Sequence, residues 1–460
     1  MMLSRSSISR SCTRALQRHC VCRRTQIRSL AAAASGSFQY ETGEEAGVKY
    51  ASRDLPGPTT TLTVVAKAGT RYQAQPGFSD ALEKFAFKST TRRSAVRMIR
   101  EVELLGGDLS AYHSRENLVI RAKFLREDLA YFTELLADVI SKTKYAPHEL
   151  NEQVVRVMKL GQKNLLANPS HLAINSAHGL AFHRGLGTPL YPTSSTTFSK
   201  YLEAEEIYNF ALSAYSKSNI AVVANGTSQS ELSKWVREFF EDAYTGGRKL
   251  ESPPSKYYGG EERIAHDKGN VMVIAFPGSS SFTSGSSWKP EIGVLAALLG
   301  GQSSIKWTPG FSLLAKAASQ HQHAHISTQN HGYSDAGLLA VTVTGTASHV
   351  GKASHSVVEA LKKIASGDVS GEDIKKATAL AKFQALETGQ DINAGLEATG
   401  SGLITGGKAY QIDEIGQAID KVGEDKVKAA AKSLLDTKAT VSTVGDLFAL
   451  PYAEDIGLKI

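Results

Sequence analysis

The sequence predicts an α+β protein of two homologous domains, each with a mostly antiparallel sheet and helices packed on one face. Two observations indicate this class. Segments with the two-residue period of strands are interspersed with segments that have the period of helices. The order of these segments in the first half returns in the second half, which indicates an internal duplication. A chain of 460 residues is also too long for a single hydrophobic core.

Three matches between the halves, in the same order, support the duplication. Residues 62–69 resemble residues 271–278. The helix that follows residues 148–150 resembles the helix that follows residues 372–374. The helix and strand that begin at residue 204 resemble those that begin at residue 423. Segment 244–262 is rich in Gly and Pro and is therefore predicted to be a linker. We accordingly place the N-terminal domain at residues 36–243 and the C-terminal domain at residues 263–460.

The first 35 residues are predicted to be a mitochondrial transit peptide. Seven Arg and no Lys or acidic residue occur in residues 1–30, a composition typical of such segments. We expect cleavage between Ser29 and Phe38. Without the seven Arg of this segment, the 52 basic residues of the chain fall to 45, which equals the number of acidic residues. The positive net charge is therefore no argument for a nucleic-acid partner. All three Cys also lie in this segment, so the mature chain has no thiolate ligand to offer.

The elements of the first half follow from local signals. Residues 59–67 are rich in β-branched side chains and predict a strand, and residues 108–114 and 117–124 predict a hairpin. Ser94 is suited to cap a helix that ends before Gly106. Pro147 suits the first turn of a longer helix, which is predicted to end at Asn168. Asn168 is also suited to cap the helix that follows.

A short helix near residues 77–94 carries the most informative motif of the chain. Zinc peptidases of one type place His-x-x-Glu-His in such a helix, where the two His bind zinc and the Glu acts as general base. Here the same frame contains Asp80, Glu83 and Lys84. The Glu is present and both His ligands are replaced. We interpret Asp80 and Lys84 as an ion pair one turn apart on a solvated helix face.

Several further motifs resemble the zinc-peptidase family of pitrilysin and the mitochondrial processing peptidase. They lie at residues 69–72, 87–90, 105–107 and 111–116, and the resemblance covers nearly the whole mature chain. The ending, residues 444–452, is most similar to that of the core subunits of ubiquinol–cytochrome c reductase, respiratory complex III. The resemblance implies a pitrilysin-like fold in both halves.

The resemblance also implies where zinc ligands would lie. The first two ligand positions fall on Asp80 and Lys84, and the third falls on the helix at residues 156–162, which has no acidic residue and carries Leu160. A protonated Lys84 offers no lone pair and repels a cation. We therefore predict no catalytic residue, no metal and no cofactor, with Asp80, Glu83, Lys84 and Leu160 as vestigial positions of an inactive metallopeptidase homologue.

The leading functional hypothesis is a non-catalytic structural and assembly subunit of complex III on the matrix side of the mitochondrial inner membrane. The resemblance implies pairing with core protein 1 and contacts with the cytochrome and Rieske iron–sulfur subunits. No run of 18 apolar residues is present, so we predict a peripheral protein without a membrane span.

The sequence leaves three alternative interpretations. The first is the substrate-recognising α subunit of the processing peptidase, but its long glycine-rich loop corresponds here to the short segment 299–304. The second is an active metallopeptidase, which the missing ligands argue against. The third is a metal site at His321, His323 and His325, for which a polar strand or loop end is the preferred interpretation.

Overall fold

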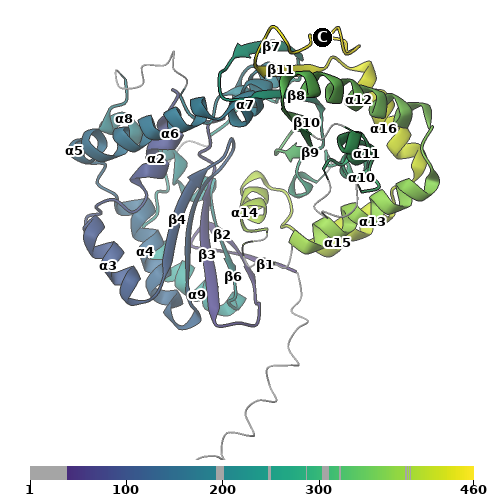
Figure 1. Ribbon diagram of the computed structural model, residues 1–460. Coiled ribbons are helices and arrows are strands. Elements are labelled where there is room, and N and C mark those ends of the chain that lie inside the picture. The colour runs from purple at the N-terminus through teal and green to yellow at the C-terminus, as the bar shows by residue number, and fades with distance from the viewer. Residues whose placement is uncertain are drawn as a thin grey trace, which may run out of the picture.

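The computed structural model describes residues 39–192, 201–246, 250–285, 287–302, 310–320, 323–388, 391, 393 and 395–460. These residues form two lobes, each built on one β-sheet, that lie side by side (Figure 1). The predicted α+β class is confirmed. No helix in the described ranges has the length and apolar character to cross a membrane.

The N-terminal lobe contains a six-stranded sheet. Its strands, in spatial order, are β1 (Glu41–Glu45), β2 (Val48–Arg53), β6 (Ile220–Asn225), β3 (Thr59–Ala66), β5 (Leu118–Leu125) and β4 (Asp108–His113). Only the pair β2–β6 is parallel. The predicted strand at residues 59–67 and the predicted hairpin correspond to β3, β4 and β5.

The C-terminal lobe repeats this arrangement with five strands. They are β7 (Gly260–Ala265), β11 (Thr440–Gly445), β8 (Asn270–Pro277), β10 (Gly337–Gly345) and β9 (Ala324–Gly332). The pair β7–β11 is parallel and the other pairs are antiparallel, as at the equivalent places of the first sheet. The shared strand order supports the internal duplication. Because β7 begins at Gly260, the end of the predicted linker lies in a strand, and the domain boundaries stay a prediction.

Helices cover one face of each sheet, as predicted (Figure 1). On the N-terminal lobe they are α2 (Phe78–Phe85), α3 (Ala95–Leu104), α4 (Leu129–Lys142), α8 (Ala204–Ala214) and α9 (Gln229–Phe239). The long predicted helix comprises α5 (Pro147–Glu149), the π-helical turn η2 (Leu150–Val154) and α6 (Val155–Ala167). On the C-terminal lobe they are α10 (Pro290–Leu299), α11 (Leu313–Gln320), α12 (Ala347–Ser366), α13 (Gly371–Thr388), α15 (Ile412–Asp420) and α16 (Glu424–Asp436).

Two predicted helix caps are confirmed. The Ser94 hydroxyl accepts a hydrogen bond from the Arg97 backbone amide at the start of α3. The Asn168 side chain accepts from the amides of Ser170 and His171 at the start of α7 (Pro169–Phe182). Each cap satisfies amide groups that have no partner within the helix.

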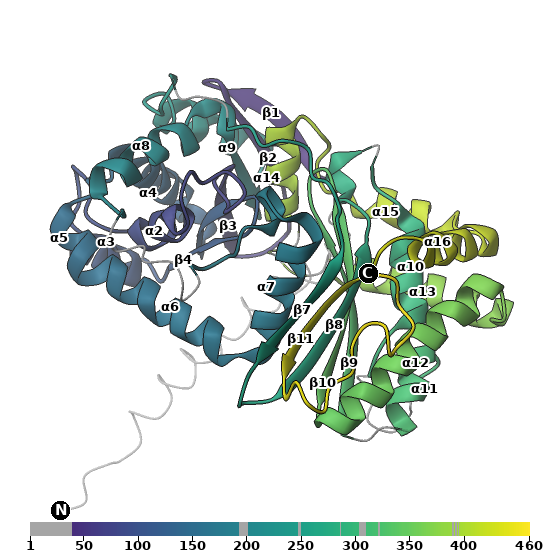
Figure 2. The ribbon, with the colours of Figure 1, turned by 90° about the horizontal axis from the view of Figure 1, so that it is seen from above.

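The other face of each sheet is covered by a helix from the opposite half of the chain (Figures 1 and 2). Helix α7, from the first half, packs on the C-terminal sheet: Ala173, Ala177 and Ala181 lie in one buried cluster with Val273 and Ala275 of β8. The predicted arrangement, with helices on one face, did not include this exchange.

Helix α14 (Leu396–Thr405), from the second half, makes the reciprocal contact on the N-terminal sheet. Its Leu396 packs with Ala51 and Val223, and its Ile404 packs with Val65. All of these side chains are buried, so each sheet depends on the other half of the chain to cover its second face.

An ionic network also joins the lobes. Arg71 follows β3, and its guanidinium lies 2.8 Å from Glu116 of the same lobe and 2.7 Å from Asp335 of the C-terminal lobe. The backbone amide of Ser334 donates to Glu116 at 2.8 Å, so the contact is continuous across the boundary. The Arg71 side chain is 4% exposed, and a charge-assisted pair is stronger in such an environment than at the surface.

A substitution at Gly400 of α14 tests the packing of this helix on the N-terminal sheet. A Cβ atom at Gly400 would lie 2.4 Å from Val65 Cγ2, so Gly400→Ala forces α14 away from β3. We expect it to lower the free energy of unfolding by about 1–3 kcal/mol, the usual cost of overpacking. Thermal and urea unfolding of the purified mature chain measure this.

The matched control is Gly293→Ala in α10, where a Cβ atom meets nothing within 4 Å. Alanine is the better helix former there and should stabilise by about 0.5–1 kcal/mol. Equal stability of the two single variants would contradict the described docking of α14.

Candidate functional site

Helix α2 places the residues of the altered zinc motif inside the N-terminal lobe. It begins after Gly77, whose φ of 99° is readily adopted only by glycine. The helix packs against β4 as well as α6 and α8. As a result the side chains of Asp80, Glu83 and Lys84 are 0%, 8% and 23% exposed.

The predicted solvated face for the Asp80–Lys84 pair is therefore wrong. The two residues are an i,i+4 pair, with Lys84 Nζ 3.9 Å from Asp80 Oδ1, but Asp80 is buried and Lys84 is only partly exposed. The reason is the packing of α2. An eight-residue helix with neighbours on several sides has almost no face left for solvent.

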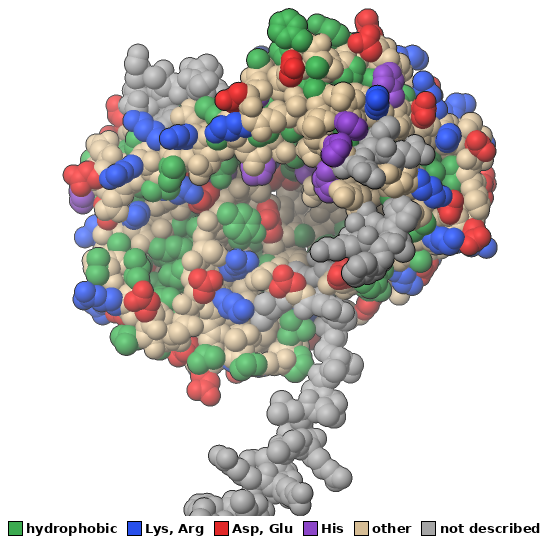
Figure 3. Space-filling model, viewed as in Figure 1, with side chains coloured by type: hydrophobic (Ala, Val, Ile, Leu, Met, Phe, Trp, Pro, Cys, Tyr) green, Lys and Arg blue, Asp and Glu red, His purple; other side chains and the backbone are tan. Residues whose placement is uncertain are grey.

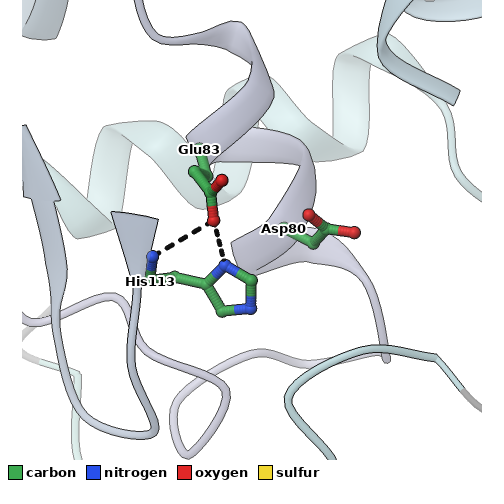
Figure 4. Close-up of side chains that lie close together, drawn as sticks. All are labelled: Asp80, Glu83 and His113. Carbon is green, nitrogen blue, oxygen red and sulfur yellow. Dashed lines mark hydrogen bonds and ion pairs between the residues drawn. The ribbon is translucent and has the colours of Figure 1, made fainter. Parts of the chain in front are cut away.

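His113, the last residue of β4, completes the site from a different element (Figure 4). Its backbone amide donates to Glu83 Oε2 at 3.1 Å, and its ring Nδ1 bonds the same oxygen. Its other ring nitrogen, Nε2, lies 2.8 Å from the carbonyl oxygen of Leu190. The Leu190 carbonyl can only accept, so Nε2 carries a proton, and a second proton on Nδ1 makes the ring an imidazolium paired with Glu83.

The charges of these groups support one another. Burial alone would lower the pKa of His113, but its hydrogen bond to the Glu83 carboxylate and the charge of that carboxylate raise the pKa above its usual value. Burial likewise opposes ionisation of Glu83, yet the bonds to His113 and Lys84 lower its pKa. The Glu83 carboxylate also raises the pKa of Lys84 in spite of burial.

Asp80 is the unusual member. Its carboxylate is fully buried, and neither oxygen has a hydrogen-bond partner among the described residues. Burial raises the pKa of Asp80 to about 6, against the attraction of His113 and Lys84. Asp80, Glu83, Lys84 and His113 together are called the ion cluster below. It contains two carboxyl groups, one amine and one imidazole.

The ion cluster does not fit zinc as it stands. Asp80, Glu83 and His113 are the one group of at least three candidate ligands that converges in the described residues, with ligand atoms within 4.8 Å of one another. However, Lys84 places an ammonium against both carboxylates, and both His113 ring nitrogens already have oxygen partners within the chain. Leu160 on α6 is 57% exposed and has no ligand atom to offer.

The histidine-rich segment shows no comparable convergence. His321 lies outside the described residues, and so do residues 303–304 of the shortened loop. The ring of His323 packs edge-on against His349 with centroids 5.1 Å apart, and His325 bonds the Gln302 side chain. In the described ranges these rings do not gather three ligand atoms.

A hollow lies between the two lobes (Figure 3), and the sequence did not predict it. It encloses a cavity of about 680 Å³ lined by residues of both halves. At its wall the Glu397 carboxylate of α14 accepts hydrogen bonds from Ser114 at 2.8 Å and Asn117 at 3.0 Å. Glu397 therefore ties α14 to the end of the β4–β5 hairpin.

Comparisons with known proteins agree with this architecture. Residues 49–194 match the model of the insulinase family, peptidase family M16, and residues 201–380 match that of the peptidase M16 inactive domain. The chain belongs to peptidase family M16. The predicted pitrilysin-like family is thereby confirmed.

Named relatives place the chain within the family. It is 51% identical over 460 residues, 100% of both chains, to the mitochondrial cytochrome b-c1 complex subunit 2 of Neurospora crassa. It is 38% identical to the protein of the same name from Cryptococcus neoformans, over 88% of this chain and 91% of that one. These matches confirm the predicted resemblance to the core subunits of complex III, and the relatives are named as its subunit 2.

A more distant relative is named as an α subunit of the mitochondrial processing peptidase, which was the first alternative interpretation of the sequence. The probable mitochondrial-processing peptidase subunit alpha-1 of Arabidopsis thaliana is 26% identical, over 90% of this chain and 83% of that protein. With the inactive-domain match, this pattern identifies the chain as an inactive homologue of the M16 metallopeptidases.

Asp80 predicts a pH dependence of stability. Its pKa of about 6 exceeds the ordinary 3.8, so the native state binds the proton more tightly than the unfolded state. The stabilisation that its neutral form provides is complete below pH 3.8 and is lost as the pH rises through about 6. The loss is of order 3 kcal/mol. Asn resembles the neutral form and does not ionise.

We therefore expect the free energy of unfolding of Asp80→Asn, relative to the unmodified chain, to rise between pH 4 and pH 7. Urea unfolding at several pH values measures the difference. Asp108→Asn, which changes an exposed side chain at the start of β4, is the control and should show no such trend. A difference for Asp80→Asn that is flat with pH would show that the carboxylate is not buried as described.

Proposed function

We propose that this chain is a non-catalytic core subunit of the mitochondrial ubiquinol–cytochrome c reductase complex, in which it supports assembly and holds the electron-transfer subunits. The observation that carries the proposal is the full-length match, at 51% identity, to the Neurospora crassa subunit 2 of the cytochrome b-c1 complex. The ion cluster supports it, because the Lys84 ammonium, paired with Glu83, stands where a peptidase needs zinc and a ligand with a free lone pair.

The architecture suits a scaffold. The exchanged helices α7 and α14 and the Arg71 network join the lobes through buried contacts, so the two lobes present their surfaces in a fixed relation. A fixed arrangement of the two lobes is what a supporting subunit requires, and it requires no reactive group. No catalytic residue, metal or cofactor is assigned to the chain, and Asp80, Glu83, Lys84 and Leu160 remain vestigial positions in this proposal.

Partners and location follow from the same proposal. We infer pairing with core protein 1 and contacts with the cytochrome and Rieske iron–sulfur subunits, on the matrix side of the inner membrane. The relatives bear mitochondrial names, and the Arg-rich residues 1–35 are suited to act as a transit peptide. The α-subunit alternative is not favoured, since its relative is 26% identical and complex III relatives reach 51%.

Native gel electrophoresis of gently solubilised mitochondria tests the proposal. We expect the chain to migrate with a large complex that stains for haem and oxidises ubiquinol, because its partners carry the cofactors. A tagged copy should recover core protein 1 and the cytochrome subunits from the same band. Migration only in a soluble, haem-free pair would contradict the proposal and favour the processing peptidase.

A further inference from the structure

The cavity between the lobes has a negative charge that the chain leaves unbalanced. Three carboxylates line it, those of Glu116, Asp391 and Glu397, and the described lining residues include no Lys or Arg. We propose that this cavity is a binding site for a small linear organic cation with two ammonium groups, an alkyl diamine in its simplest form. This site is separate from the ion cluster, and its existence does not depend on the proposed role in complex III.

Glu397 of α14 is the first anchor for an ammonium group. Its carboxylate accepts hydrogen bonds from Ser114 at 2.8 Å, Asn117 at 3.0 Å and the Tyr112 hydroxyl at 3.1 Å. All three donors are neutral, so they orient the carboxylate without balancing its charge. Burial and the charge of Glu397 raise the pKa of Tyr112, so that hydroxyl keeps its proton. An ammonium group that enters the cavity therefore meets an anion already held in place.

The neighbouring titratable groups do not supply the missing positive charge. Glu116 is paired with Arg71 at 2.8 Å, so the charge of that arginine is already used. Burial and the nearby charge of Arg115 lower the pKa of His331 to about 4, so its ring is neutral at pH 7. The cavity wall thus stays anionic at the pH of the cell.

Asp391 provides the second uncompensated carboxylate. Its Oδ1 accepts hydrogen bonds from the backbone amide of Asn393 at 2.9 Å and from the side chain of Asn393 at 3.0 Å, and both donors are neutral. Arg53 donates to the backbone carbonyl oxygen of Asp391 at 3.5 Å. Because Asp391 and Glu397 line one cavity, two ammonium groups on a flexible chain balance both charges.

The size and walls of the cavity suit such a ligand. Its volume of about 680 Å³ lies within the range of about 300–1,000 Å³ that is usual for small-molecule sites. The lobes on either side are joined by buried contacts, so the cavity is formed before any ligand arrives. Aromatic faces attract ammonium groups, and hydroxyl oxygens accept their hydrogen bonds. The wall offers both, from Tyr112, Tyr333, Tyr410, Thr283, Ser334 and Ser401.

Isothermal titration calorimetry of the full mature chain with cadaverine, a diamine with a five-carbon chain, tests the proposal. We expect saturable binding of one cadaverine per chain. The diol of the same length has no charge and should not bind. Nα-acetyl-lysine amide presents one ammonium as a polypeptide does, and it should bind more weakly than the diamine because it leaves one carboxylate unbalanced.

Glu397→Gln ties the binding to the first anchor. Glutamine keeps a carbonyl oxygen for Ser114 and Asn117 but has no charge, so we expect cadaverine to bind at least about tenfold more weakly. The matched control is Glu359→Gln on α12, which removes the same charge from an exposed position and should leave the affinity unchanged.

Asp391→Asn tests the second anchor by comparing two ligands. Asp391 is exposed, so we expect this variant to weaken cadaverine binding by about two- to fivefold. Binding of pentylamine, which has a single ammonium group, should not change. This comparison also serves if Glu397→Gln lowers the melting temperature, because the Asp391 side chain lies outside the packed core.

Four results would overturn the proposal. They are absence of saturable cadaverine binding, equal binding of the diamine and the diol, equal affinity of Glu397→Gln and Glu359→Gln, and tighter binding of Nα-acetyl-lysine amide than of cadaverine. The last result would assign the cavity to a lysine side chain of a polypeptide instead of a free diamine.

Discussion

The reciprocal exchange of helices between the two halves is the constraint on which the structure depends. Neither lobe covers both faces of its own sheet: α7 buries one face of the C-terminal sheet and α14 buries one face of the N-terminal sheet. The duplication that produced two similar sheets therefore did not produce two independent domains. The Arg71 network adds a charged contact at the same boundary. A chain organised in this way is suited to hold other proteins in register.

The ion cluster shows how a metallopeptidase frame persists without its chemistry. In peptidases with the His-x-x-Glu-His motif, zinc joins the motif helix to the rest of the site. Here Lys84 and His113 pair with Glu83 and make this connection within the chain itself. The link between α2 and β4 is therefore independent of bound metal. Glu83 keeps the place of a general base, but its oxygens are occupied by donors and are not free to activate water. The replacement thus preserves the packing of α2 while removing the means of hydrolysis.

Local signals predicted much of the fold, and long-range packing was beyond them. The strands β3, β4 and β5 and the caps Ser94 and Asn168 follow from neighbouring residues alone. The alanines of α7 have a helical period, but a period does not reveal which sheet they meet. The buried state of Asp80 was missed because it depends on α6 and α8. His113 was missed as a partner because 30 residues separate it from Glu83, although it lies in a motif that carried the family resemblance.

Complementation distinguishes a chain that contributes structure alone from one that also contributes catalysis. Mitochondria that lack the chain are supplied with the unmodified chain or with Glu83→Gln, which removes the general base of a peptidase. The measurement is the rate of ubiquinol-dependent cytochrome c reduction per haem. We expect equal turnover per haem for the two chains and unchanged processing of imported precursors, even if Glu83→Gln lowers the amount of complex. An assembled complex with reduced turnover, or accumulation of unprocessed precursors, would contradict a purely structural role.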